Sequence, residues 1–193
     1  HGDFIDVLLR HAAERGVKCR VLVDAIGSKA WKRKLKALLS PHGIHVLEVL
    51  PVRLWRRRTG RFDLRNHRKI VVIDGQIGYV GSQNLVAAQF KEDLTYEELV
   101  VRMEGPIVLE LQFVFISDWL LETDELLNKK RYFPLTERKG PVAAQALPSG
   151  PTMPWKINHC MFVDLIHSAR NRVVLSTPAL FPEGALLQGL HTA

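Results

Sequence analysis

The chain has 193 residues, 47% of them hydrophobic, so it can bury the core of one domain or slightly more and need not be disordered. Its formal net charge of +7 predicts an anionic partner: nucleic acid, anionic lipid headgroups or a phosphorylated small molecule. No apolar run reaches about 18 residues, so the sequence predicts no transmembrane helix. Because the first residue is His1 and not Met, we expect a fragment of a longer protein.

Helical and strand patterns alternate in the first part of the chain. Apolar residues at helical spacing predict a helix over residues 4–12 and a second one, set among basic residues, over residues 31–39. Hydrophobic stretches over residues 17–24 and 44–49 predict two strands. A strand is therefore expected after each of these helices.

The middle of the chain predicts a β-hairpin followed by a third strand. Residues 67–74 are strand-like, and residues 76–80 predict the returning strand. Asp74 and Gly75 form a turn signal between them. Residues 97–103 then predict another strand.

A long apolar helix and a connector follow the third strand. Pro106 is predicted at the first helical position, and the helix is expected to run to about Leu127. Residues 128–154 are richer in Pro, Gly and charge, which predicts a connector with a short strand over residues 142–147.

Helical and strand patterns also alternate in the last part of the chain. We expect a helix from Trp155, a strand over residues 172–176 and another helix from Glu183. Helices that alternate with hydrophobic strands predict an α/β layered fold.

The predicted hairpin carries side chains suited to phosphoryl transfer. His67 and Lys69 are two residues apart, so a strand places both on one face. A neutral imidazole can attack phosphorus, and a lysine ammonium can hold the phosphoryl oxygens. The hairpin returns Ser82 and Asn84 toward His67, and Gly81 lets backbone approach a ligand. This set is what phosphodiester exchange through a covalent intermediate requires.

Each of these residues alone is most often an ordinary surface residue. Their spacing, however, is very unlikely to arise by chance. His67, Lys69, Asp74 and the Gly-Ser-x-Asn loop together fix six positions across eighteen residues. This spacing matches the HKD motif of the phospholipase D superfamily at every fixed position. The segments NHRKIVVIDGQIGYVGSQNL and YEELVVRMEGP, the pair Asp118-Trp119 and the run PSGP resemble bacterial cardiolipin synthases in that order.

The resemblance covers nearly the whole chain and implies a phospholipase D-like α-β-α sandwich. Such a fold has a mixed central sheet flanked by helices on both faces, and this chain would hold one half of a duplicated architecture. Residues 1–127 would be the first domain with the HKD motif, residues 128–154 a connector, and residues 155–193 the truncated start of a second domain.

The resemblance also implies a mechanism. His67 would form a phosphohistidine, Lys69 and Asn84 would bind the phosphate, and Ser82 would assist. The enzyme would be a phosphatidyl transferase that makes cardiolipin from two phosphatidylglycerols without metal or cofactor. In the family two HKD motifs meet at one site, and this chain has only one. We therefore expect half an active site and an isolated chain without activity.

Asp74 completes the candidate catalytic set of His67, Lys69 and Asp74, but its position argues for a structural role. It is seven residues from His67, which on a strand gives the opposite face and a separation of roughly 23 Å. We expect it to support the turn by accepting backbone hydrogen bonds. The superfamily often has a glutamate at the start of the next strand, which makes Glu98 a possible orienter of His67. The alternative for Glu98 is an ordinary solvated strand residue.

A basic stretch over residues 53–68 precedes the motif, with Arg56, Arg57 and Arg58 at its centre and apolar residues interleaved. This composition suits the headgroups of an anionic membrane, nucleic acid, or a merely solvated surface. We favour the lipid, so these arginines are predicted headgroup contacts and nucleic acid is the lesser alternative.

Two rival functions stay open. One is a single-motif phosphodiesterase or nuclease that acts as a homodimer, and the other is a non-catalytic fragment that binds anionic lipid. The expected partners are phosphatidylglycerol, the membrane surface, and either a second HKD half or a second copy. The full-length parent is expected at the bacterial cytoplasmic membrane.

Overall fold

The computed structural model describes residues 2–51, 65–84, 95, 97–150, 157–177, 182 and 184–192. The chain divides into two compact units, His1–Ala146 and Leu147–Ala193, and each is described by itself. Their boundary lies within the segment 128–154 that the sequence predicts to be a connector. Whether the units correspond to two phospholipase D-like domains stays a prediction.

The first unit opens with a parallel pair of strands connected through a helix. Its elements are α1 (Gly2–Glu14), β1 (Arg20–Asp24), α2 (Lys32–Leu39), the 3₁₀ turn η1 (Ser40–His42) and β2 (His45–Val49). Strands β1 and β2 pair in parallel, with Val21 opposite Val46. The four predicted elements of this region are confirmed, with ends that shift by up to three residues.

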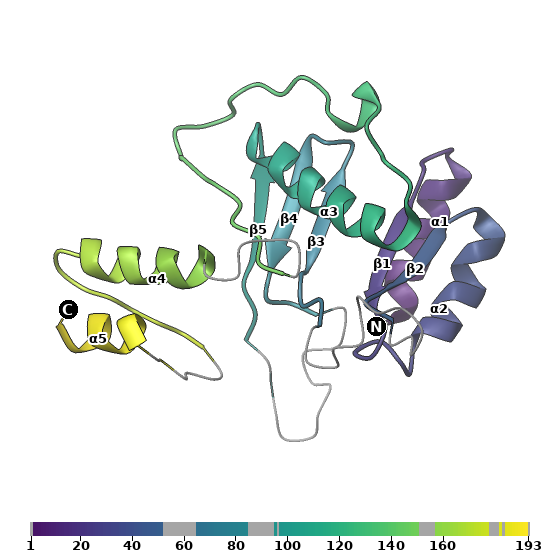
Figure 1. The fold of residues 1–193 in the computed structure, drawn as a ribbon. Helices are drawn as coiled ribbons and strands as arrows, with labels where there is room; N and C mark the ends of the chain where they lie inside the picture. The colour runs from purple at the N-terminus through teal and green to yellow at the C-terminus, as the bar shows by residue number, and fades with distance from the viewer. Residues whose placement is uncertain are drawn as a thin grey trace. The chain divides into compact units, whose positions relative to one another are not determined.

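The rest of the first unit is an antiparallel sheet and a long helix (Figure 1). Its elements are β3 (Ile70–Ile73), β4 (Ile77–Gly81), β5 (Val100–Glu104), α3 (Ile107–Thr123) and the 3₁₀ turn η2 (Lys130–Tyr132). The strand order is β3-β4-β5. The structure is thus a mixed α/β fold, as expected. Its parallel and antiparallel ladders are separate in the part of the chain that the structure describes.

The parallel strands lie between two helical layers because their side chains alternate between faces. On one face Val21, Val23 and Val46 pack with residues of α1 and α2 around the fully buried Leu39. On the other face Leu22 and Leu47 pack against Ile116 and Trp119 of α3. These contacts form the α-β-α layers that the resemblance implies.

Helix α3 connects the two sheets. Its first half lies on the antiparallel sheet, where the backbone of Gly78 is close to Val108 and Leu111. Its second half covers β1 and β2 through Ile116 and Trp119. Figure 1 shows the helix running across both groups of strands. The helix is apolar on nearly all sides because it contacts β2, β3, β4 and β5 along its length.

Helix α3 has slightly different ends from those predicted. Pro106 is the residue before the first helical turn, and the helix ends at Thr123 and not near Leu127. The reason for the early end is Asp124, which takes a left-handed conformation with φ of 57° and closes the helix. None of the described helices is long and apolar enough to cross a membrane.

The second unit contains two helices, α4 (Ile157–Ser168) and α5 (Gly184–Thr192). They pack through Ile166, which is buried, and Gly189, which has no side chain to separate the helices. Both helices were predicted, with starts within about two residues.

Two predicted strands are wrong. Residues 142–147 and 172–176 have no regular secondary structure. A β-strand is stable only when a neighbouring strand satisfies its backbone hydrogen bonds. No neighbouring strand pairs with either segment among the residues that the structure describes. The hydrophobic pattern of residues 172–176 is therefore not sufficient for a strand here.

Candidate functional site

The motif hairpin has the geometry that its sequence predicts. Strands β3 and β4 are antiparallel, with Ile73 opposite Ile77. Asp74 and Gly75 have φ of 54° and 65°, and the Gln76 amide donates to the Ile73 carbonyl at 3.0 Å. Positive φ at both central residues is the mark of a type I′ turn, which Asp-Gly favours.

The pairing continues beyond the start of β3 toward His67. The Gly81 amide donates to the Lys69 carbonyl at 3.3 Å, so Ser82 returns beside the strand that carries the motif. The Lys69 ammonium donates to the backbone carbonyl of His67 at 2.7 Å. The ammonium is thus held next to His67, whose own side chain is exposed. The two motif residues His67 and Lys69 therefore lie together at the open end of the hairpin, and their action on one phosphate stays a prediction.

Ser82 is bound to Glu98. Its hydroxyl donates to the Glu98 carboxylate at 2.5 Å and accepts the Leu99 amide at 3.0 Å. The Ser82 amide in turn donates to the Leu99 carbonyl at 2.9 Å. Since a hydroxyl has one proton, this Ser82 cannot also donate to a phosphate unless the pair rearranges. The contact places a carboxylate in the motif loop, whereas a direct contact between Glu98 and His67 stays a prediction.

A buried carboxylate of α3 binds both residues next to His67. Asp118 is only 9% exposed. One of its oxygens accepts the Asn66 side-chain amide at 2.9 Å, and the Arg68 guanidinium contacts both oxygens at 2.7 and 2.8 Å. Charge-assisted bonds of this kind are among the stronger ones in proteins. They fix the backbone on either side of His67 to the helix that spans the fold.

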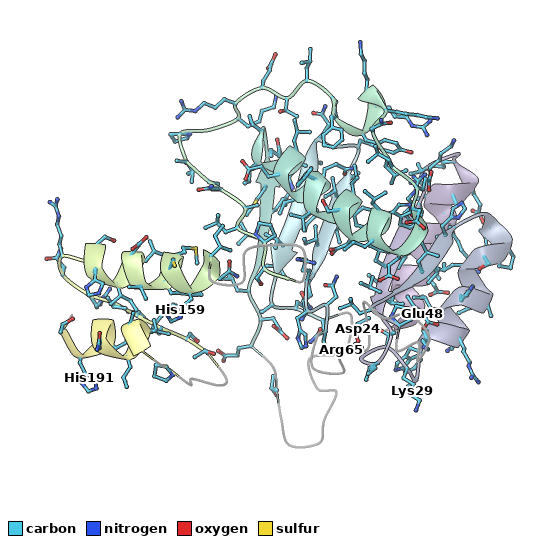
Figure 2. The ribbon with its side chains drawn as sticks, in the orientation of Figure 1. Asp24, Lys29, Glu48, Arg65, His159 and His191 are labelled. Atoms are coloured by element: carbon cyan, nitrogen blue, oxygen red, sulfur yellow. The ribbon has the colours of Figure 1, made fainter. Side chains whose placement is uncertain are left out.

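A second carboxylate, at the end of β1, holds the same segment. Asp24 accepts the Asn66 backbone amide at 3.1 Å through one oxygen and the amides of Ile26 and Gly27 at 3.0 and 2.7 Å through the other. Arg65 contacts Asp24 at 3.6 Å, and Figure 2 shows the two together. Burial by itself raises the pKa of the Asp24 carboxyl, but the three amides and Arg65 together hold its pKa below the usual value.

These residues form one flanking network, which we define as Asp24, Arg65, Asn66, Arg68 and Asp118. It attaches the peptide of His67 to β1 on one side and to α3 on the other. The contacts of the network are made by the residues on either side of His67 and not by the His67 ring, so they hold the backbone that carries the ring. Sequence reasoning placed Arg65 and Arg68 only within the basic stretch and gave Asp24, Asn66 and Asp118 no role, although a carboxylate between Ile116 and Trp119 of the largely apolar α3 is a usable signal for Asp118.

Comparison with known proteins matches most of the chain to one family. The family described as cardiolipin synthase, PLD-like domain, matches residues 1–119, which include the hairpin and the whole flanking network. The match covers more than half of the chain. The chain belongs to this family.

Individual members of the family are similar over almost all of the chain. The cardiolipin synthase A of Yersinia pseudotuberculosis serotype O:1b (strain IP 31758) is 36% identical over 200 residues, which cover 99% of this chain and 41% of that protein. The cardiolipin synthase A of Yersinia pestis bv. Antiqua (strain Angola) gives the same values. The chain therefore spans about two fifths of the length of these cardiolipin synthases.

The remaining predicted site residues of this cardiolipin synthase-family chain are distributed as follows. Asn84 is exposed beyond the end of β4, and its approach to His67 stays a prediction. Asp74 is exposed at the tip of the hairpin, at the end opposite His67. Arg56, Arg57 and Arg58 lie outside the described residues. Among the described residues no group of three or more His, Cys, Asp or Glu side chains is placed to hold a metal ion.

Gly81 lies directly against the backbone of a neighbouring strand, and its predicted approach to a ligand stays a prediction. A Cβ at this position would lie 2.1 Å from the Leu99 carbonyl oxygen and 2.8 Å from the Val100 Cα. The backbone that approaches Gly81 closely therefore belongs to β5 and the residue before it. Glycine is required here so that β5 can pair with β4.

We expect Gly81→Ala to lower the free energy of unfolding by roughly 1–3 kcal/mol, because the methyl group forces β4 and β5 apart. Urea denaturation measures the change. Gly140→Ala is the control, since a Cβ at Gly140 meets nothing within 4 Å. Equal stability of the two variants would contradict this account of Gly81.

At Asp74 we expect alanine and asparagine to differ. Alanine in the left-handed conformation costs about 1–2 kcal/mol, whereas asparagine adopts it readily. Asp74→Ala should therefore lower the melting temperature, and Asp74→Asn should not. If Asp74→Asn instead abolishes phosphoryl transfer in the assembled enzyme, the carboxylate takes part in the chemistry and the turn role is wrong.

Proposed function

We propose that this chain is the first catalytic half of a cardiolipin synthase. The enzyme transfers the phosphatidyl group of one phosphatidylglycerol to a hydroxyl of another and releases glycerol. The observation that carries the proposal is the exposed His67 with the Lys69 ammonium held beside it, in a chain of the cardiolipin synthase family. The first unit is the first phospholipase D-like domain, and the second unit begins the second domain.

The reaction proceeds in two displacements at phosphorus. The His67 imidazole attacks the phosphorus of the donor, the bond from phosphorus to the glycerol oxygen breaks, and a phosphohistidine forms. A hydroxyl of the second phosphatidylglycerol then attacks this intermediate and frees His67. The glycerol oxygen receives a proton as it leaves, and the incoming hydroxyl loses one.

The chain supplies part of this machinery. An ammonium has three N–H donors, and one of those of Lys69 binds the His67 carbonyl, which leaves donors for the phosphoryl oxygens. Asn84 and Ser82 add amide and hydroxyl groups at the same end of the hairpin, with Glu98 as the partner of Ser82. The acid and base for the alcohols would come from the histidine of a second HKD motif.

Assay of two substrates separates this function from its rivals. The chain is mixed with a polypeptide that carries the second HKD half and is given labelled phosphatidylglycerol or single-stranded DNA. We expect labelled cardiolipin and glycerol and intact DNA. Cleavage of the DNA by the chain alone would favour a nuclease homodimer, and vesicle binding without product would favour a non-catalytic lipid-binding protein.

The arginine stretch gives a further prediction. The parent enzyme is proposed to work at the bacterial cytoplasmic membrane, where Arg56, Arg57 and Arg58 contact anionic headgroups. Replacing all three with Ser should weaken binding to phosphatidylglycerol vesicles by about 1 kcal/mol per charge at most. Cosedimentation at low and high salt measures this. Unchanged vesicle binding would remove these arginines from the membrane contact.

A further inference from the structure

Asn66 lies directly before His67 and makes hydrogen bonds in three directions. Its side-chain oxygen accepts the backbone amide of Arg68 at 3.0 Å. Its side-chain NH₂ group donates to the Asp118 carboxylate at 2.9 Å, and its backbone amide donates to the Asp24 carboxylate at 3.1 Å. These partners come from the motif segment itself, from α3 and from the end of β1. The contacts of the flanking network therefore converge on Asn66.

The bond between the Asn66 side chain and Arg68 closes a small turn around His67. A side-chain oxygen that accepts the backbone amide two residues later forms an Asx turn, which takes the place of a backbone turn. His67 is the central residue of this turn. The Lys69 ammonium also binds the His67 carbonyl, at 2.7 Å. The backbone of His67 is thus held by side chains on both sides of it in sequence, while its own side chain is exposed.

The turn is attached to the packed part of the first unit. Asp118, which accepts from the Asn66 side chain, is only 9% exposed on α3. Asp24 is the last residue of β1, and its second oxygen accepts two backbone amides of the following turn at 3.0 and 2.7 Å. A displacement of Asn66 would therefore break hydrogen bonds to a buried helix residue and to the end of a strand at the same time.

The side-chain amide of asparagine suits both of its contacts. It has an acceptor oxygen and donor N–H groups on the same carbon. An aspartate has the same shape and could accept the Arg68 amide, but an ionised carboxylate has no proton to donate to Asp118. Two carboxylates in contact also repel each other. The contacts on the two sides of His67 thus account for an asparagine at position 66.

We propose that Asn66 is a positioning residue for His67, an inference that rests on the proposed function. Asn66 acts through the backbone of His67 and sets the direction from which the imidazole meets the phosphorus. Reacting atoms must lie about 3–3.5 Å apart with aligned orbitals, and a misplacement of about 1 Å can cost about 10²-fold in rate. The phosphate contacts proposed for Lys69, Ser82 and Asn84 do not involve Asn66, so substrate binding is independent of it.

Kinetics of the chain assembled with a second HKD half test this inference. Asn66→Ala removes both side-chain hydrogen bonds and keeps the backbone amide that Asp24 accepts. We expect kcat for cardiolipin formation to fall about 10²-fold while KM stays nearly unchanged. Asn128→Ala, at an exposed asparagine after α3, is the matched control and should keep the kcat of the parent. A raised KM with an unchanged kcat would make Asn66 a substrate-binding residue and would overturn the proposal.

Exchanging the two partners of the Asn66–Asp118 bond gives a rescue experiment. Asn66→Asp alone brings two carboxylates together and should lower kcat as Asn66→Ala does. Combined with Asp118→Asn, it leaves one carboxylate and one amide facing each other, with the direction of the hydrogen bond reversed. We expect the doubly substituted enzyme to recover most of the lost kcat. A doubly substituted enzyme that is folded yet as slow as the single variants would overturn the proposal.

A measurement on the 193-residue chain alone does not depend on the proposed reaction. Hydrogen exchange of the Arg68 amide, followed by NMR, reports whether the turn around His67 is closed. We expect the amide to be protected in the parent and in Asn128→Ala and to lose protection in Asn66→Ala. If the assembled parent makes no cardiolipin, the proposed function is wrong, but this pattern would still support Asn66 as the residue that holds the His67 segment. Equally fast exchange in the parent and in Asn66→Ala would overturn the inference whether or not cardiolipin is made.

Discussion

Given phosphatidylglycerol vesicles, the chain alone is expected to make cardiolipin about 10²–10⁴-fold more slowly than the chain mixed with a second HKD half, since general acids typically contribute that factor. His67 can attack phosphorus, but the glycerol oxygen must also receive a proton as it leaves. No other histidine of the sequence can be part of a second HKD motif, because none is followed two residues later by Lys. Figure 2 shows His159 on α4 and His191 on α5, both in the second unit.

Turnover measured against protein concentration decides this prediction. A second half added in trans should restore the rate, and His67→Ala should remove it again. Turnover that rises steeply with concentration would show that two copies of the chain assemble a site as a homodimer. A rate that is independent of concentration, stays with the monomer on sizing and disappears in His67→Ala would contradict the two-motif mechanism.

Asp118→Asn is expected to lower the free energy of unfolding by about 2–4 kcal/mol and to reduce transfer in the assembled enzyme. The carboxylate accepts from Asn66 and from Arg68 on both oxygens. An amide offers only one acceptor oxygen, so its NH₂ group must face a donor. Arg68, whose side chain is 21% exposed, then loses the negative charge of Asp118.

Asp124→Asn is the matched control for this exchange. Asp124 follows the same helix, is exposed and has a left-handed conformation that asparagine tolerates. Urea denaturation should give a lower free energy of unfolding for Asp118→Asn than for Asp124→Asn. Phosphatidyl transfer should be measured under conditions in which both variants are folded. If Asp118→Asn lowers stability but the folded enzyme transfers at the full rate, Asp118 supports the fold without positioning His67.

The local elements were largely predictable because they depend on neighbours in sequence. The short hydrophobic run over residues 70–73 and the dipeptide Asp74-Gly75 are sufficient to predict the motif hairpin, and the structure has the type I′ turn that this dipeptide favours. The alternation of helices and strands likewise predicted the mixed α/β fold. The predicted strand over residues 172–176 failed, since a strand also requires a partner that no local pattern can guarantee.

The sequence by itself determined the motif and the family, and it predicted His67 and Lys69 as the central pair. Tertiary structure alone decided what surrounds them. Asn66 meets Asp24 and Asp118 across 42 and 52 residues of chain, and Ser82 meets Glu98 across 16. Spacing in sequence reports which side chains share a face of one strand or helix. The partner of a buried charge depends on which distant segments the core brings together, and α3 does this by packing on both sheets.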